Sequence, residues 1–244
     1  MSEQLQSDFD KIVKNSKFSN KEIQLKKDFL NKFIESGFPN RKQEDWKFLD
    51  ISQIIKKNIS DLSYFIDYSQ SNKIDPSTFV GGLEHNKIIF LNGRIEKIDF
   101  NHEDKSKIEI SDETKKDISF NYENSLIDLN CAFTDKVFKI LVKKDYSLKK
   151  PLIIYHSTND SIKSTNINLR LDFELGENSC LKLIDYFANN TTKNFINIFY
   201  NFNLEKDSIL KNYKIDKFRN DNLTYSFNNI EQGNNSVSET FILS

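Results

Sequence analysis

The chain has 244 residues, of which 37% are hydrophobic and 29% charged, and a formal net charge of −1. This composition is typical of a folded protein and excludes general disorder, and the near-zero charge gives no electrostatic reason to bind nucleic acid or an anionic membrane. No stretch approaches the roughly 18 uninterrupted apolar residues of a membrane helix. Residues 1–10 lack the apolar core of a signal peptide, so we expect a cytoplasmic protein with no membrane partner.

The first 66 residues are expected to form a helical domain. Apolar residues recur at helical spacing in two stretches, which predicts one buried face on each helix. Ser19 and Glu22 have the spacing of a capping box, in which each side chain binds a free backbone N–H group of the other residue. Gly37 and Pro39 predict the end of the second helix, and a weaker helical stretch covers residues 51–57. The apolar stripes are Leu5, Phe9, Ile12 and Val13, and then Leu25, Phe29, Leu30, Phe33 and Ile34.

Residues 67–86 are predicted to be a linker, and strands are expected from residue 87 onward. The linker is polar and contains Pro76 and the pair Gly81-Gly82. Residues 87–91 and 94–98 then flank Asn92-Gly93. That dipeptide accepts the two positive φ angles of a type I′ turn, so we predict a β-hairpin.

A regular alternation of apolar and polar residues dominates the chain from Phe138 onward, as in residues 167–173. Such alternation places one face of a strand inside and the other in water. Anchor residues recur roughly every 14 residues with turn-forming residues between them, which predicts stacked strands with buried anchors. The period alone does not distinguish a β-solenoid from an antiparallel meander or sandwich. The anchors are Phe138, Leu152, Ile167, Leu181, Ile196, Leu210, Leu223 and Val237.

The sequence offers few candidates for catalysis or metal binding. Cys131 and Cys180 are the only thiols, and a small buried thiol is the interpretation that we favour for both. His85, His102 and His156 have no second His or Cys at ligand spacing. No phosphate-binding loop, Ser/His/Asp arrangement or pair of carboxylates stands out. We therefore predict no catalytic residue and no metal site, assign no cofactor-binding residue, and expect a protein that is not an enzyme.

One segment, residues 37–50, carries the single tryptophan and resembles a known signature. It reads Gly-Phe-Pro-Asn-Arg-Lys-Gln-Glu-Asp-Trp-Lys-Phe-Leu-Asp, and it is similar to the Gly-x-Pro-x-Arg-x-x-Glu-x-Trp-Lys-Tyr-Thr pattern that follows the N-terminal helices of SufD proteins. Phe48 and Leu49 depart from the Tyr-Thr of that pattern, although an aromatic residue is retained. The matching residues are Gly37, Pro39, Arg41, Glu44, Trp46 and Lys47.

Shorter matches follow in the order found in the same family. Asn92 and Gly93 end a Phe-Leu-Asn-Gly stretch that resembles the family's Phe-Val-Asn-Gly hairpin. Asn130 and Phe133 lie in Leu-Asn-Cys-Ala-Phe, which resembles Leu-Asn-x-Ala-Phe. Three later stretches, at residues 150–154, 177–181 and 207–213, also resemble the family's segments. On this shared order the chain is similar to the SufD branch of the SufB/SufD family of iron–sulfur cluster assembly proteins.

The resemblance implies an α+β fold that is mainly β. It comprises an N-terminal helical domain (1–66), the linker (67–86) and a right-handed β-helix, or β-solenoid (87–244). It also implies a non-catalytic scaffold that pairs with a SufB-like protein in a complex with a SufC-like ATPase. This chain alone would bind no cofactor, because the cluster is assembled on the complex and ATP binds to the SufC-like partner. Trp46 would anchor the helical region to the β region, and none of the three histidines would take a role in cluster assembly.

Members of the family are longer than this sequence. Their remaining coils and the C-terminal helical domain that docks SufC have no counterpart here. We therefore expect a β-helix core that is incomplete at its C-terminal end, with Val237, Phe241 and Leu243 facing inward on a sticky last strand. Because that helical domain has no counterpart in this sequence, we expect docking of a SufC-like protein to be doubtful.

Two other functions fit a β-solenoid. A carbohydrate-binding or structural module would want exposed rows of aromatic side chains along one face. A pectinase-like hydrolase would need acids on adjacent coils at one phase of the period, and the sequence shows no such column.

The cysteine content generates a first prediction. Iron–sulfur clusters are usually held by four thiolates, whereas this chain has two cysteines far apart in sequence. The purified chain is therefore expected to retain no stoichiometric cluster after anaerobic reconstitution, as measured by iron analysis and the visible absorption spectrum. A stoichiometric cluster that is lost on changing Cys131 or Cys180 would contradict this.

Overall fold

The computed structural model describes residues 2–68, 79–113, 123–187, 193–216 and 221–243. The helices among them are α1 (Ser2–Asn15), α2 (Asn20–Ser36), α3 (Ile51–Asn58) and α4 (Ser125–Phe133), with short 3-10 turns η1 (Glu44–Trp46) and η3 (Lys105–Lys107). The strands are β1 (Asn86–Leu91), β2 (Arg94–Asp99), β3 (Ile108–Glu113), β4 (Val137–Val142), β5 (Leu152–Ser157), β6 (Asn166–Leu175), β7 (Cys180–Phe187), β8 (Phe195–Leu204), β9 (Ile209–Asp216), β10 (Leu223–Gln232) and β11 (Val237–Leu243). Half of the predicted linker, residues 69–78, lies outside the described residues.

The N-terminal helices form where local sequence signals predict them. Ser19 caps α2, because its hydroxyl accepts from the Glu22 N–H at 3.3 Å while the Glu22 carboxylate accepts from the Ser19 N–H at 2.7 Å. Gly37 ends α2 with a φ of +68°, and its N–H donates to the Phe33 carbonyl. The predicted helices and the capping box are therefore confirmed.

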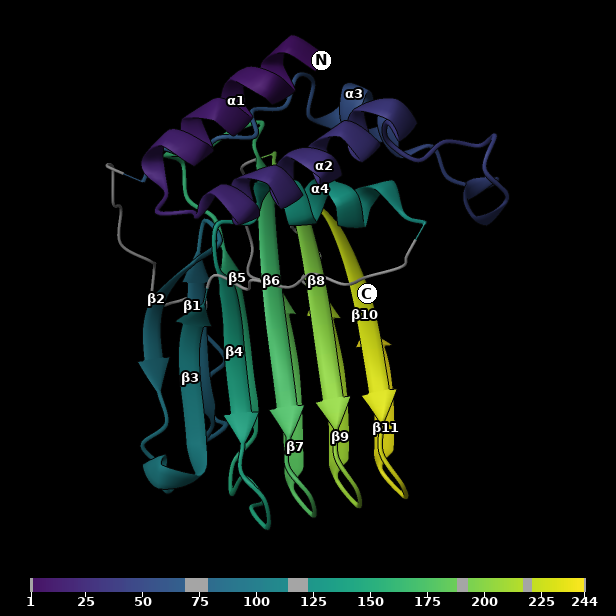
Figure 1. Cartoon of the computed structure of the whole chain (residues 1–244). Coiled ribbons are helices and arrows are strands. Elements are labelled where there is room, and N and C mark those ends of the chain that lie inside the picture. Colours follow the sequence, from purple (N-terminus) through teal and green to yellow (C-terminus); the bar gives the residue numbers. More distant parts are fainter. Residues whose placement is uncertain (1, 69–78, 114–122, 188–192, 217–220, 244) are drawn as a thin grey trace.

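The strands wind into a β-solenoid of about three turns, and the chain is richer in strand than in helix. One sheet has the order β11-β9-β7-β5-β1-β2 and the other β10-β8-β6-β4-β3. Successive turns pair in parallel, as β6 does with β8 and β8 with β10. Antiparallel pairs occur where β2 joins β1 and β3 joins β4. From β4 onward consecutive strands alternate between the two sheets, and their parallel ladders exclude the meander and the sandwich (Figure 1).

The hairpin at Asn92-Gly93 is confirmed and closes the β1–β2 pair. Asn92 and Gly93 have φ angles of +52° and +83°, as a type I′ turn requires. A Cβ atom on Gly93 would lie 2.7 Å from Ile167 Cγ2, so the turn also leaves no room for a side chain. The turn therefore packs directly against the first residues of β6.

Alternation along the strands fills the solenoid interior. Leu152, Leu181 and Leu210 are buried in one sheet, and Ile167 and Ile196 face them from the other. The prediction of strands from Phe138 onward is confirmed, and so is the burial of the first six anchors.

The last two anchors, Leu223 and Val237, were predicted to be buried, and this was wrong. Thr224 pairs with Ile196, and Ser238 pairs with Leu210, so the inward phase has moved by one residue. A shift of one residue sends a side chain to the opposite face of a strand. Leu223 accordingly lies half-buried on the outer face, and Val237 is 42% exposed.

The same shift corrects the orientation expected for β11. Phe241 pairs with Tyr213, and Leu243 with Ile215, which are outward-facing positions of β9. Phe241 is 50% exposed. The inward positions of this strand are Ser238, Thr240 and Ile242, so the interior-facing side of β11 is more polar than the sequence indicated.

A helical layer covers the upper part of the β6–β8–β10 face (Figure 1). It includes α4, which lies within the range predicted to be the β-helix core (87–244). The outward side chains beneath it include aromatic residues, of which Phe195 and Phe199 are fully buried against the helices, and buried polar residues such as Arg170. Asn130 of α4 joins the layers, because its side-chain amide donates to the Leu169 carbonyl of β6 at 3.1 Å and to the Asn197 carbonyl of β8 at 2.9 Å.

These bonds generate a prediction for Asn130→Ala. The change removes two buried hydrogen bonds to strand carbonyls, and each such loss costs about 1–3 kcal/mol. The unfolding free energy from urea titration should fall by about 2–4 kcal/mol. Asn203→Ala, on the exposed half of β8, is the matched control and should change it by less than about 0.5 kcal/mol. Equal effects of the two substitutions would show that Asn130 does not hold the layers together.

Candidate functional site

The signature residues of segment 37–47 lie at the edge of the helical layer. Trp46 is half-buried, and its ring lies 5.8 Å from that of Tyr225 on β10, so it does contact the β region as expected. Glu44 and Lys47 form an exposed ion pair at 2.8 Å, and Arg41 is exposed. The Pro39 carbonyl accepts from the Ile51 N–H at 3.1 Å, which fixes the start of α3.

The remaining signature residues lie at two other junctions. The Asn92 N–H donates to the Ser157 carbonyl at 2.9 Å, tying the hairpin to β5. Phe133 is buried at the end of α4, with its ring 5.2 Å from that of Tyr64. Asn130 makes the bridge described above. The signature residues therefore hold separate parts of the fold together and do not converge on one pocket.

A different set of polar side chains does converge, inside the solenoid. The Tyr200 hydroxyl of β8 donates to Asp185 Oδ1 of β7 at 2.8 Å. His156 Nε2 of β5 lies 3.2 Å from the same carboxylate oxygen and 3.2 Å from the Tyr200 hydroxyl. Burial and the neighbouring carboxylate raise the pKa of Tyr200 far above its usual value. Three strands from successive turns thus meet at one hydrogen-bonded group.

Lys214 extends this group toward β10. It pairs in register with Asp185, and its Nζ lies 4.6 Å from the centre of the Tyr200 ring. The same Nζ donates to Ser226 Oγ at 2.8 Å and to Asn228 Oδ1 at 3.1 Å. Burial lowers the pKa of Lys214, and the charge of Asp185 opposes that shift. A buried acid and a buried base are therefore held in neighbouring turns.

The geometry of this interior cluster limits its chemistry. His156 is sandwiched by Phe90 at 5.9 Å and Phe187 at 4.6 Å, in near-parallel stacks. His156, Asp185 and Tyr200 are almost fully buried. A substrate would have to enter the solenoid to reach them. Within the described part of the chain, Asp185 Oδ2 has no hydrogen-bond partner, so the cluster carries a free-energy cost that its other contacts must offset.

From the sequence, His156 was expected to have no role, and Asp185, Tyr200 and Lys214 were not recognised as partners. A signal was present, since Asp185 follows Leu183 on the inward phase of β7, and Lys214 shares the inward phase of β9 with Leu210. Polar residues at an inward phase mark a buried polar group. The contact between them, however, depends on the pairing of β5, β7 and β8.

The cysteines take different positions. Cys131 is buried, and burial raises its pKa to about 11, so it remains a protonated thiol at neutral pH. Cys180 is only half-buried, which corrects the expectation of burial for both.

Beside Cys131, buried Lys26 donates to the backbone carbonyls of Cys131, at 3.1 Å, and of Thr134. An ammonium group at the C-terminal end of α4 is favoured by the helix dipole.

Neither a metal-binding group nor a membrane-spanning helix is found among the described residues. No three His, Cys, Asp or Glu side chains among them are grouped to hold a metal ion. None of the helices in that part of the chain combines the length and the apolar character needed to cross a bilayer. A scan of protein-family models gives no match, and neither does a search of curated proteins.

The buried Lys26 generates a prediction about pH. Burial lowers its pKa from 10.5 to about 8, so between these values the unfolded chain binds more protons than the folded chain. The unfolding free energy contributed by this group therefore rises as the pH rises from 8 to 10.5. Lys26→Met should remove that rise in urea titrations across this range.

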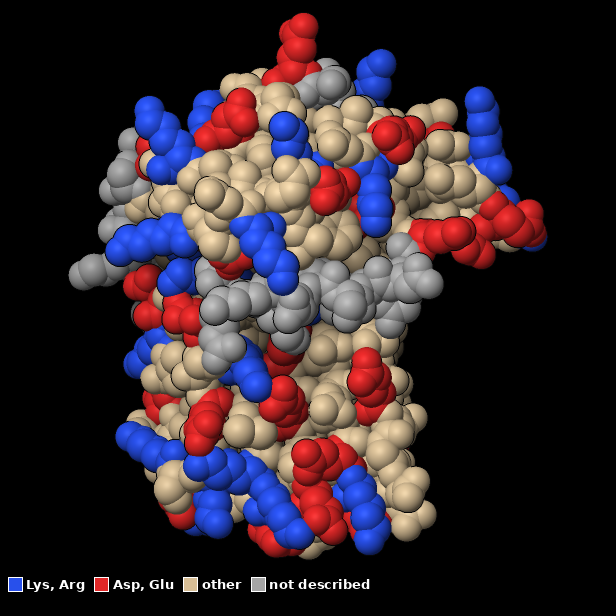
Figure 2. Space-filling view, viewed as in Figure 1, with Lys and Arg blue, Asp and Glu red and all other residues tan. Residues whose placement is uncertain are grey.

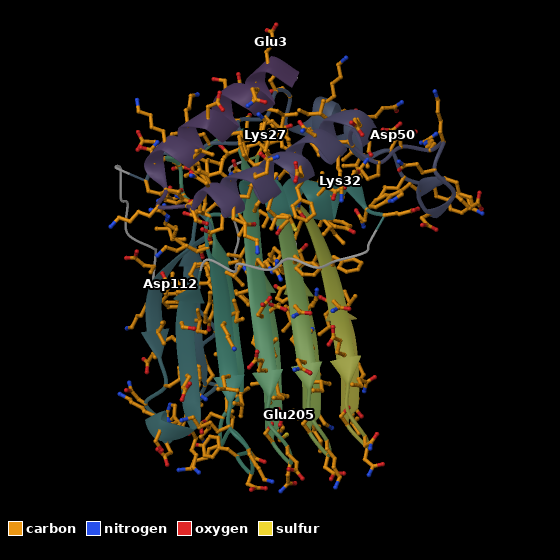
Figure 3. The ribbon with its side chains drawn as sticks, in the orientation of Figure 1. Glu3, Lys27, Lys32, Asp50, Asp112 and Glu205 are labelled. Atoms are coloured by element: carbon orange, nitrogen blue, oxygen red, sulfur yellow. The ribbon has the colours of Figure 1, made fainter. Side chains whose placement is uncertain are left out.

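Lys27→Met is the matched control, because Lys27 is exposed on the same helix (Figure 3). It should retain the pH dependence of the unchanged protein. A Lys26→Met protein with the same slope as the Lys27→Met protein would show that Lys26 titrates normally.

Proposed function

We propose that this protein is a non-catalytic scaffold subunit for iron–sulfur cluster assembly, of the SufD type, which pairs with a SufB-like protein. The partner complex includes a SufC-like ATPase, which binds ATP. The iron–sulfur cluster is the cargo assembled on the complex, and this chain alone binds no cofactor. The proposal includes a right-handed winding of the solenoid and a cytoplasmic location.

One observation carries the proposal: several residues that resemble the SufD signature hold parts of the fold together, either between the helical layer and the solenoid or within the solenoid. Trp46 packs against β10, Asn130 bridges β6 and β8, and Asn92 ties the hairpin to β5. Such roles explain why these residue types are needed at these places in a helical-plus-solenoid fold. The likeness in sequence and the likeness in architecture therefore support each other.

The chemistry of the site also supports a protein without catalytic activity. The interior cluster around Asp185 is enclosed, and Cys131 is a buried thiol with a raised pKa. A catalytic acid or nucleophile must reach its substrate. The described side chains that most resemble catalytic groups instead pack within the fold.

The alternative function is a carbohydrate-binding or structural β-solenoid module. It would want exposed rows of aromatic side chains, and the outward face of β5, β7 and β9 does carry Tyr155, Tyr186 and Tyr213. Tyr155 and Tyr186 are buried, however. The Tyr213 ring stacks on that of Phe241 at 5.3 Å. These two rings form a single exposed aromatic pair, whereas a carbohydrate-binding module needs a longer row.

Co-purification tests the proposal. The tagged chain, co-expressed with SufB-like and SufC-like proteins, is expected to retain the SufB-like protein at a fixed ratio through size-exclusion chromatography. A folded chain that retains neither protein would contradict the proposal. Retention on a polysaccharide column, with no retention of the SufB-like protein, would favour the alternative.

A further inference from the structure

A groove of about 530 Å³ lies between α2, the segment that carries η1, and the start of α4. Figure 1 shows this segment projecting from the helical layer, to the right of α2 and α4. The groove is open on one side, and its walls come from three parts of the chain that are far apart in sequence. Its shape therefore depends on the docking of α4 under α2.

The groove is lined by more acidic than basic residues. Acidic side chains gather on the projecting segment (Figure 2), and Lys32 of α2 contributes a positive charge to the lining (Figure 3). Lys47 already pairs with Glu44. The lining acids are Glu35, Glu44, Asp45, Glu123 and Asp128.

Asp128 shows that this charge is incompletely compensated. Its side chain is half-buried, and burial raises its pKa while the charge of Lys32 lowers it. Its backbone N–H donates to the Asn124 carbonyl, but its carboxylate forms no hydrogen bond or ion pair with any residue that the structure describes. A cationic group placed in the groove would favour the ionised carboxylate.

The hydroxyl group of Ser125 is a second, independent indication. Ser125 lines the groove at the first residue of α4 and is more than nine-tenths buried. Among the described residues, its Oγ has no hydrogen-bond partner. A buried hydroxyl is normally hydrogen-bonded, so this position calls for a polar group from an occupant.

Apolar and aromatic side chains complete the groove. Phe29 and Ile127 are buried in its floor, and Trp46 presents a half-buried indole. Phe48 follows the groove residue Trp46 by two positions in the sequence. Its side chain is 86% exposed, which is unusual for a large apolar residue. An occupant that matches this lining must be cationic and must also carry apolar side chains.

We propose that the groove binds a short segment of a partner protein that is rich in arginine and contains apolar residues. A guanidinium group is planar, stacks on an indole face and pairs with carboxylates through two parallel hydrogen bonds, so it matches both Trp46 and the acidic rim. Apolar residues of the segment pack on Phe48 and the floor. This docking surface is independent of the proposed role in cluster assembly.

Trp46 provides the readout, because it is the chain's single tryptophan. The full chain is titrated with a Trp-free peptide of alternating Arg and Leu, and with a counterpart that has Glu in place of Arg. The Arg peptide should change Trp46 emission in a saturable way, whereas the Glu peptide should not. Asp45→Asn with Asp128→Asn should raise the Kd of the Arg peptide about fivefold or more, because two charge pairs are lost.

Two further variants separate the groove from general attraction between opposite charges. Asp61→Asn with Glu96→Gln removes two exposed acids elsewhere and should leave the Kd unchanged. Lys32→Gln removes the competing positive charge and should lower the Kd about twofold, a gain that misfolding would not produce. The proposal is overturned if no saturable change occurs, if the Glu peptide binds equally well, or if both acid-to-amide pairs weaken binding to the same extent.

Discussion

Parallel pairing between successive turns is the constraint on which the rest of the structure depends. From β6 onward, residues 28 or 29 positions apart lie side by side, as Asn201 and Asn229 do, with a hydrogen bond of 2.8 Å between their side chains. Once this register is set, each side chain faces either the interior or the outer surface. The apolar interior, the aromatic side chains on the outer face and the interior polar cluster all follow from it.

The outer face of β6, β8 and β10 explains why the helices lie where they do. Aromatic side chains at outward positions, such as Phe195, Phe199 and Phe227, would be unfavourable in water. Burying them under α2 and α4 removes that cost, and Asn130 satisfies two strand carbonyls at the same contact. Asn130, one of the residues that resemble a family signature, thus connects the helical layer to the sheet.

The interior cluster of His156, Asp185 and Tyr200 places polar groups where the solenoid is otherwise apolar. A slip of β7 or β8 by one residue would move Asp185 or Tyr200 to the outer face and break the group. The cluster therefore favours one pairing of turns over its neighbours. Such a fixed register would keep surfaces such as the acidic groove beside Trp46 in a constant position, as the proposed scaffold function requires.

The sequence by itself determined the features that depend on neighbouring residues. The capping box of Ser19 and Glu22 and the turn at Asn92-Gly93 are set by local hydrogen bonds and φ preferences, and the solenoid itself was expected from the resemblance, since the period left it open. Tertiary structure decided what depends on register and docking. Val237 faces outward because β11 pairs with β9 at a separation of 28 residues, whereas β9 pairs with β7 at a separation of 29. Asp128 and Trp46 share a groove only because α4 docks under α2. A one-residue change in spacing hardly alters the pattern of a strand, yet it reverses which face is buried.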